Sequence, residues 1–140
     1  MIKLKIIDGT NLVYGRLSAH VAKELLRGEE IVIVNAKDVA VTGSEEFVLK
    51  KFRERMDIGS VRKGPYYPRT SNQILRRSIG DMLPKKKTTG KDALSRCLVF
   101  SSVPKEYAGR DMETVETAKN SKVSGFVTLG KVSERLGGKY

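Results

Sequence analysis

The side chains best suited to chemistry are basic and aromatic groups that follow one another between residues 59 and 96. They stand as Arg62-Lys63-Gly-Pro-Tyr66-Tyr67-Pro-Arg69, Arg76-Arg77, Lys85-Lys86-Lys87, Lys91 and Arg96. Lysine gives a phosphate a point charge, arginine gives a planar fork for phosphates or bases, and tyrosine gives a stacking surface. The cluster predicts a nucleic-acid surface. A plain solvated face, with Tyr66 or Tyr67 packed on the domain, is the alternative.

The distribution of charge favours a polyanion as the partner. The 140 residues carry 27 basic and 16 acidic side chains, for a formal net charge of +11. Residues 59–110 hold 12 bases and 3 acids, whereas the segments before and after them are nearly balanced. Solubility alone is served by interspersed charges, while a concentrated basic block raises the local potential and attracts polyanions. Nucleic acid is therefore the expected partner.

Catalytic and metal-binding patterns are weak elsewhere in the sequence. Gly125 to Lys131 has the glycine and lysine spacing of a phosphate-binding P-loop, but Val132 replaces the Ser or Thr that would hold magnesium. His20 and Cys97 are the single histidine and cysteine, so a set of metal ligands is lacking, and a buried packing role is favoured for Cys97. We expect no enzyme activity, no cofactor and no small-molecule substrate.

Length and hydropathy indicate the setting in which the chain works. A chain of 140 residues has the size of one domain. The longest aliphatic run, Ile31 to Val34, is far shorter than the about 20 residues of a membrane span or the about 7–15 of a signal peptide. A single cysteine excludes an intramolecular disulfide and fits a reducing compartment. We expect a cytoplasmic protein that makes no membrane contact.

Hydrophobic periodicity predicts the elements that must position the basic residues. Strands are expected over 2–8, 31–34, 39–42 and 97–100, and helices over 15–27, 45–56, 71–83 and from 90 onward. Ser44 and Ser71 are the expected caps of two of these helices. C-terminal to these elements, apolar residues recur at helical spacing only over 126–136, where they follow Thr128. The order predicts a small sheet, parallel at its start, with helices on both faces.

Six short motifs stand in a characteristic order between about residues 6 and 104. They are Ile7-Asp8, Gly15-Arg16-Leu17, Val34-Asn35-Ala36, Val41-Thr42-Gly43, Met82-Leu83-Pro84 and Leu98-Val99-Phe100. Together they resemble the universal large-subunit ribosomal protein family L-thirteen. Gly64-Pro65-Tyr66, the Arg76-Arg77 pair and the three lysines at 85–87 are similar to its archaeal and eukaryotic branch, and we expect an archaeal source. Asp81 departs from the family pattern and weakens the case for a phosphate contact at that turn.

The resemblance implies both an architecture and a role. The expected architecture is a three-layer α/β/α fold around a small, largely parallel sheet, with a basic loop-helix insertion. We expect a single domain over 1–140 with its core at about 4–104, its RNA-binding segment at about 59–96 and a C-terminal docking extension at 105–140. The implied role is that of a non-catalytic constituent of the large ribosomal subunit, which binds large-subunit ribosomal RNA and neighbouring ribosomal proteins and supports subunit assembly.

The residues expected to contact RNA combine the basic cluster with one position outside it. They are Arg16, Arg62, Lys63, Tyr66, Tyr67, Arg69, Arg76, Arg77, Lys85, Lys86, Lys87, Lys91 and Arg96. Arg16 could equally serve strand-helix packing. The alternative functions are a free nucleic-acid-binding regulator and a small enzyme acting on a phosphate substrate. The break at Pro84 to Lys87 makes residues 71–96 a poor helix-turn-helix, which counts against the regulator.

Overall fold

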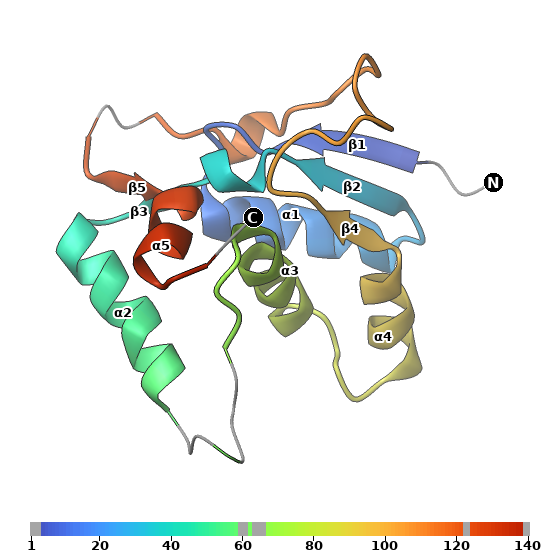
Figure 1. Cartoon of the computed structure of the whole chain (residues 1–140). Coiled ribbons are helices and arrows are strands. Elements are labelled where there is room, and N and C mark those ends of the chain that lie inside the picture. The colour runs from blue at the N-terminus through green and yellow to red at the C-terminus, as the bar shows by residue number, and fades with distance from the viewer. Residues whose placement is uncertain (1–3, 59–61, 63–66, 122–123, 139–140) are drawn as a thin grey trace.

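The computed structural model describes residues 4–58, 62, 67–121 and 124–138 (Figure 1). Its elements, in chain order, are β1 (Leu4–Asp8), α1 (Tyr14–Leu26), β2 (Glu30–Val34), the 3-10 turn η1 (Ala36–Asp38), β3 (Ala40–Thr42), α2 (Glu45–Asp57), α3 (Ser71–Asp81), α4 (Thr88–Ser95), β4 (Cys97–Val99), the 3-10 turn η2 (Glu116–Ala118), β5 (Phe126–Thr128) and α5 (Leu129–Arg135). The expected α/β class is confirmed.

A parallel three-stranded sheet in the order β1-β2-β4 forms the centre of the molecule. Ile33 of β2 pairs with Ile7 of β1 on one side and with Val99 of β4 on the other. Because β2 is the middle strand, its side chains from Ile31 to Val34 are all buried. This position explains why the run is β-branched and apolar on both faces.

Helices α1, α3 and α4 pack together against one face of this sheet. The buried row of α1, Leu17, Val21 and Leu25, is fully enclosed there together with Ile31 and Ile33. The helix ends where predicted, because Gly28 adopts a φ of +95°, a conformation that favours glycine.

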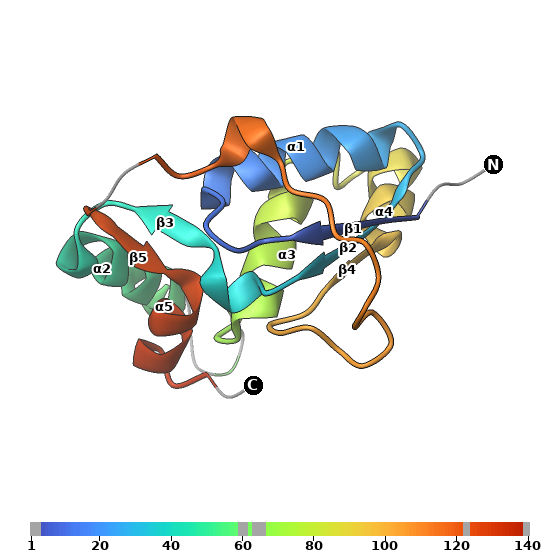
Figure 2. The same cartoon turned by 90° about the horizontal axis from the view of Figure 1, so that it is seen from above.

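The opposite face of the sheet differs from the expectation of helices on both sides. Val32 and Val34 point to this face, where they contact side chains of the irregular chain that follows β4. Those side chains are Phe100, Val103, Tyr107 and Met112. Figure 2 shows α1 on one side of the sheet and this irregular segment on the other. A few unevenly spaced apolar residues can cover three short strands without the periodicity of a helix.

The C-terminal segment forms a second sheet, which the helical spacing over 126–136 did not predict. β5 pairs antiparallel with β3, with Val127 opposite Val41. The helix α5 starts after β5, and the Thr128 hydroxyl accepts a hydrogen bond from the Lys131 amide at 3.4 Å. Leu129 and Val132 of α5 are buried in the same cluster as the residues of α1. β5 has only three residues and directly precedes the apolar row of a helix. Its strand periodicity is therefore too short to be recognised in the sequence.

The basic segment is built into the core rather than inserted at its edge. Ile74, Leu75 and Ile79 of α3 are fully buried. Ser71 is the first residue of this helix rather than its cap, which is Thr70, and the Ser71 hydroxyl lies 2.8 Å from the Ser101 hydroxyl. The exposed cations of α3 are therefore carried by a helix that the core holds firmly.

Candidate nucleic-acid interface

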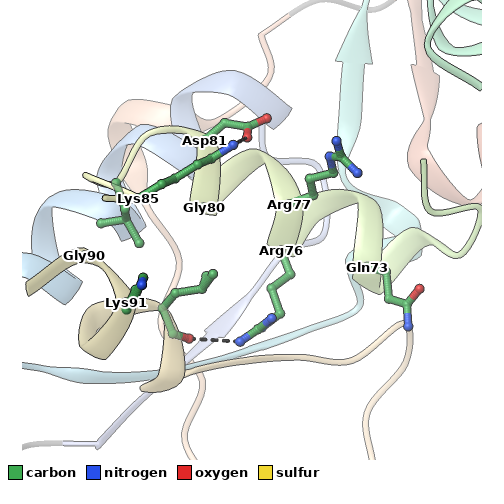
Figure 3. Close-up of a pocket in the computed structure, with 10 residues that line it drawn as sticks. Gln73, Arg76, Arg77, Gly80, Asp81, Lys85, Gly90 and Lys91 are labelled. Carbon is green, nitrogen blue, oxygen red and sulfur yellow. Dashed lines mark hydrogen bonds and ion pairs between the residues drawn. The ribbon is translucent and has the colours of Figure 1, made fainter. Parts of the chain in front are cut away.

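A hollow of about 540 Å³ lies between α3, the turn at 82–87 and α4 (Figure 3). Its walls carry both basic and apolar side chains, contributed by Gln73, Arg76, Arg77, Gly80, Asp81, Leu83, Lys85, Gly90, Lys91 and Leu94. Four of the residues expected to bind RNA, Arg76, Arg77, Lys85 and Lys91, thus come from two helices and a turn to one place. We call the walls and mouth of this hollow, with the adjoining Lys86 and Lys87, the α3–α4 patch.

Helical geometry and one close approach shape the patch. The apolar row of α3 faces the core, so Arg76 and Arg77 are displaced to its exposed side. Gly90 of α4 allows the helix to lie against the preceding turn, because a Cβ atom at this position would collide with the carbonyl oxygen of Pro84. The glycine therefore sets how closely α4 approaches the turn that carries the three lysines.

The cations of the α3–α4 patch have different local partners. Lys85 forms an ion pair with Asp81, one helical turn earlier. The Arg76 guanidinium donates to the Leu94 carbonyl at 3.2 Å and to the Cys97 carbonyl at 3.4 Å. Lys91 is exposed at the mouth of the hollow. Arg76 is thus held in place, while Lys85 already has an anionic partner, as the departure at Asp81 suggested.

Tyr67 packs on the domain, which is the alternative that its sequence position left open. Its ring lies 6.1 Å from that of Phe52, centroid to centroid. The Arg55 guanidinium donates to the Tyr67 hydroxyl at 3.2 Å, and the Arg77 guanidinium lies 4.9 Å from the ring centroid. Burial raises the pKa of Tyr14, which stacks edge-on against Phe52, to about 12. The cluster fixes Arg77 through a cation–π contact.

The remaining expected RNA-binding residues that the structure describes do not line the larger hollow. Arg62 and Arg69 are exposed, and the Arg69 carbonyl accepts a hydrogen bond from Ser133 at 2.7 Å. Lys63 and Tyr66 lie outside the described residues. Arg96 is half-buried, and its guanidinium donates to the Leu25 carbonyl at 2.7 Å, which ties the end of α4 to α1.

Arg16 lies apart from the α3–α4 patch. It lines a smaller hollow of about 220 Å³ together with Val13, Thr42 and residues 119–121. Lys119 is therefore a second cation in that hollow, and it also forms an ion pair with Glu116 at 3.0 Å. The sequence analysis did not include Lys119, because 103 positions separate it from Arg16 and no local pattern links them.

Sequence reasoning assigned four of the ten lining residues of the larger hollow to RNA and left six unassigned, among them Gln73 and Leu94. Gln73 lies three and four residues before the arginine pair, so helical spacing could have assigned it to their face. Leu94 had no such signal, because its exposure to the hollow depends on how α4 packs against α3. The hollow is therefore a product of tertiary packing.

The groups considered for catalysis, nucleotide binding or metal binding have ordinary structural roles. Lys131 of the P-loop-like segment forms an ion pair with Glu45 at 3.2 Å, and residues 126–128 are strand rather than a phosphate-binding loop. His20 lies 3.1 Å from Glu24. Burial raises the pKa of the Cys97 thiol to about 11. Across the described ranges we find no cluster of three metal-ligating side chains, and no helix there is long and apolar enough to cross a bilayer.

Comparison with known proteins gives matches along nearly the whole chain. The model of the family "Ribosomal protein L13" matches residues 2–106. A protein of Thermoplasma volcanium is 58% identical over 135 residues, which cover 96% of this chain and 99% of that protein. Relatives from Archaeoglobus fulgidus and Methanosarcina barkeri are 44% and 41% identical and cover 94% and 98% of this chain, with 86% and 100% of their own lengths matched. All three are called large ribosomal subunit protein uL13.

Proposed function

Because the chain belongs to the ribosomal protein L13 family, we propose that it binds large-subunit ribosomal RNA through the α3–α4 patch and supports assembly of the subunit. It acts there as a non-enzymatic constituent of the ribosome in the cytoplasm. The whole chain works as one domain, and its partners are ribosomal RNA and the neighbouring proteins of the large subunit.

The observation that carries this proposal is the convergence of basic side chains on one rigid support. Arg76 and Arg77 come from α3, Lys85 to Lys87 from the turn, and Lys91 from α4. All are exposed, yet the two helices that carry the arginines and Lys91, and that flank the turn with its three lysines, have buried residues in the core. A support of this kind fixes the backbone positions of the cations, so less of the chain has to be ordered when RNA binds.

The proposal assigns different roles to the basic residues. The exposed lysines neutralise phosphates, a contact that sets position and orientation but reads no sequence. Arg76 and Arg77 combine an RNA contact with the internal bonds that fix them. Arg96 serves the fold, because its guanidinium bridges α4 and α1. Arg16 and Lys119 form a separate, smaller basic site that can meet a second RNA segment.

The direct test is a sedimentation profile of a lysate from the source cells, probed for this protein at low and high salt. We expect cosedimentation with large subunits and their precursors. The purified protein should also bind large-subunit ribosomal RNA with an affinity that falls steeply with salt. A protein that stays at the top of the gradient, and whose RNA affinity hardly depends on salt, would contradict the proposal.

A further inference from the structure

We propose that the hollow of the α3–α4 patch receives one unstacked nucleotide of the ribosomal RNA, with its base in the hollow and its phosphate at the basic rim. This inference rests on the proposed function and makes it more specific. Phosphate neutralisation alone needs an exposed basic surface and no concavity. A concave site with an apolar wall is the added feature that calls for a different ligand group.

The size and lining of the hollow fit a flat, partly apolar group. Its volume of about 540 Å³ lies within the about 300–1,000 Å³ of typical small-molecule pockets. Leu83 and Leu94 supply apolar wall, and Gly80 and Gly90 add surface without side chains. Bases within a duplex stay stacked and cannot enter such a site, whereas a base from a loop or bulge can be splayed out.

Arg76 gives the hollow a preorganised planar group. Its guanidinium donates to the backbone carbonyl of Leu94 (dashed line in Figure 3) and also to that of Cys97, and these two bonds fix the orientation of its plane. Arginine planes are common stacking partners for unpaired bases. A guanidinium already fixed in this way loses little conformational freedom when a base stacks on it.

The charge of the rim favours a nucleotide over an apolar side chain of a neighbouring protein. Four basic residues and one acidic residue line the hollow, and the acid, Asp81, is paired with Lys85. Lys91 stands at the mouth on α4, where it can neutralise the phosphate of the bound nucleotide. Asp81 gives the rim an acceptor for a base amino group or a ribose hydroxyl, which a purely cationic surface would lack.

Two substitutions, each paired with a control elsewhere on the surface, separate binding in the hollow from general electrostatic binding. Leu94→Phe fills the hollow without changing charge, and Leu4→Phe makes the same change at an exposed position on β1. Lys91→Gln removes one rim charge, and Lys50→Gln removes one from the exposed side of α2. Melting curves of all four variants report whether each protein remains folded.

The probes are a short oligoadenylate with one 2-aminopurine and a blunt RNA duplex of mixed sequence. We expect Leu94→Phe to weaken binding of the single strand about tenfold, in line with the loss of one stacked base, and to leave duplex binding within about twofold. Lys91→Gln should weaken single-strand binding more than Lys50→Gln does. The 2-aminopurine signal should change on binding to the wild type and much less with Leu94→Phe. Equal losses for both probes, or no loss for either, would overturn the inference.

A crosslink identifies the occupant even if Leu94→Phe fails to fold. Gln73 lines the hollow and is exposed, and the one natural cysteine is buried, so a cysteine introduced as Gln73→Cys takes a photocrosslinker selectively. In large subunits reconstituted with this protein, crosslinks to RNA at an unpaired nucleotide support the inference. Crosslinks to a protein, or to paired RNA only, overturn it. If the wild type binds neither probe and does not cosediment with large subunits, the proposed function fails as well.

Discussion

Replacement of the four exposed lysines of the α3–α4 patch tests whether its charges bind phosphates. The variant changes Lys85, Lys86, Lys87 and Lys91 to Gln and lowers the formal net charge from +11 to +7. Each lost phosphate contact should flatten the salt dependence of log K by about 0.9, which is about a 3.5-fold change in affinity between about 50 and 200 mM salt. Because Lys85 is partly neutralised by Asp81, we count three to four contacts.

The expected difference is therefore large. Between about 50 and 200 mM salt, both proteins lose affinity for RNA, and the factor by which the wild type weakens should be about 40–150 times larger than the factor for the variant. Its stability should change little, because the four side chains are exposed and the single ion pair that is lost is of a kind worth about 0–1 kcal/mol. The measurements are fluorescence anisotropy titrations with a large-subunit ribosomal RNA fragment at several salt concentrations, together with melting curves.

A matched control keeps net charge constant and moves the substitutions elsewhere. It changes four other exposed lysines, Lys23, Lys50, Lys51 and Lys105, to Gln and also lowers the formal net charge to +7. We expect its salt slope to stay close to that of the wild type. If both variants flatten the slope equally, total charge rather than the α3–α4 patch governs binding, and the reasoning is refuted.

Three further predictions address stability. Gly90→Ala should destabilise the protein by about 1–3 kcal/mol or more in denaturant titrations, because the added carbon collides with Pro84. Arg96→Gln should cost about 1.5–3 kcal/mol through its lost bond to Leu25 and leave the RNA salt slope unchanged; a flatter slope would reassign Arg96 to the RNA. Burial raises the pKa of Asp8, but the three hydrogen bonds that this carboxylate accepts lower it more, so its folded pKa lies below 3.8. The contribution of the ionised Asp8 to the free energy of unfolding is present above pH 3.8 and is lost as the pH falls through the lower folded pKa. Melting temperatures at acid and neutral pH should therefore differ more for the wild type than for Asp8→Asn.

The sequence by itself determined the features that depend on near neighbours along the chain. The helices α1 and α2 follow from apolar residues at helical spacing, from the stop at Gly28 and from the cap at Ser44, whose hydroxyl accepts from the Phe47 amide at 3.3 Å. The central strand β2 follows from an unbroken β-branched run. The concentration of positive charge between residues 59 and 96 is likewise a property of the sequence alone, and it indicated nucleic acid as the class of partner.

Only the tertiary structure decided which distant residues meet. β3 pairs with β5 although 86 positions separate Val41 from Val127, and no local pattern encodes such a pairing. The second face of the sheet is covered by irregular chain because its few apolar residues suffice for a small area. The sequence shows which residues are basic. Which groups each basic side chain contacts depends on the backbone segments that lie near it after folding. Arg76 and Arg96 looked like their exposed neighbours in the sequence, and packing gave both of them carbonyl partners from other elements of the fold.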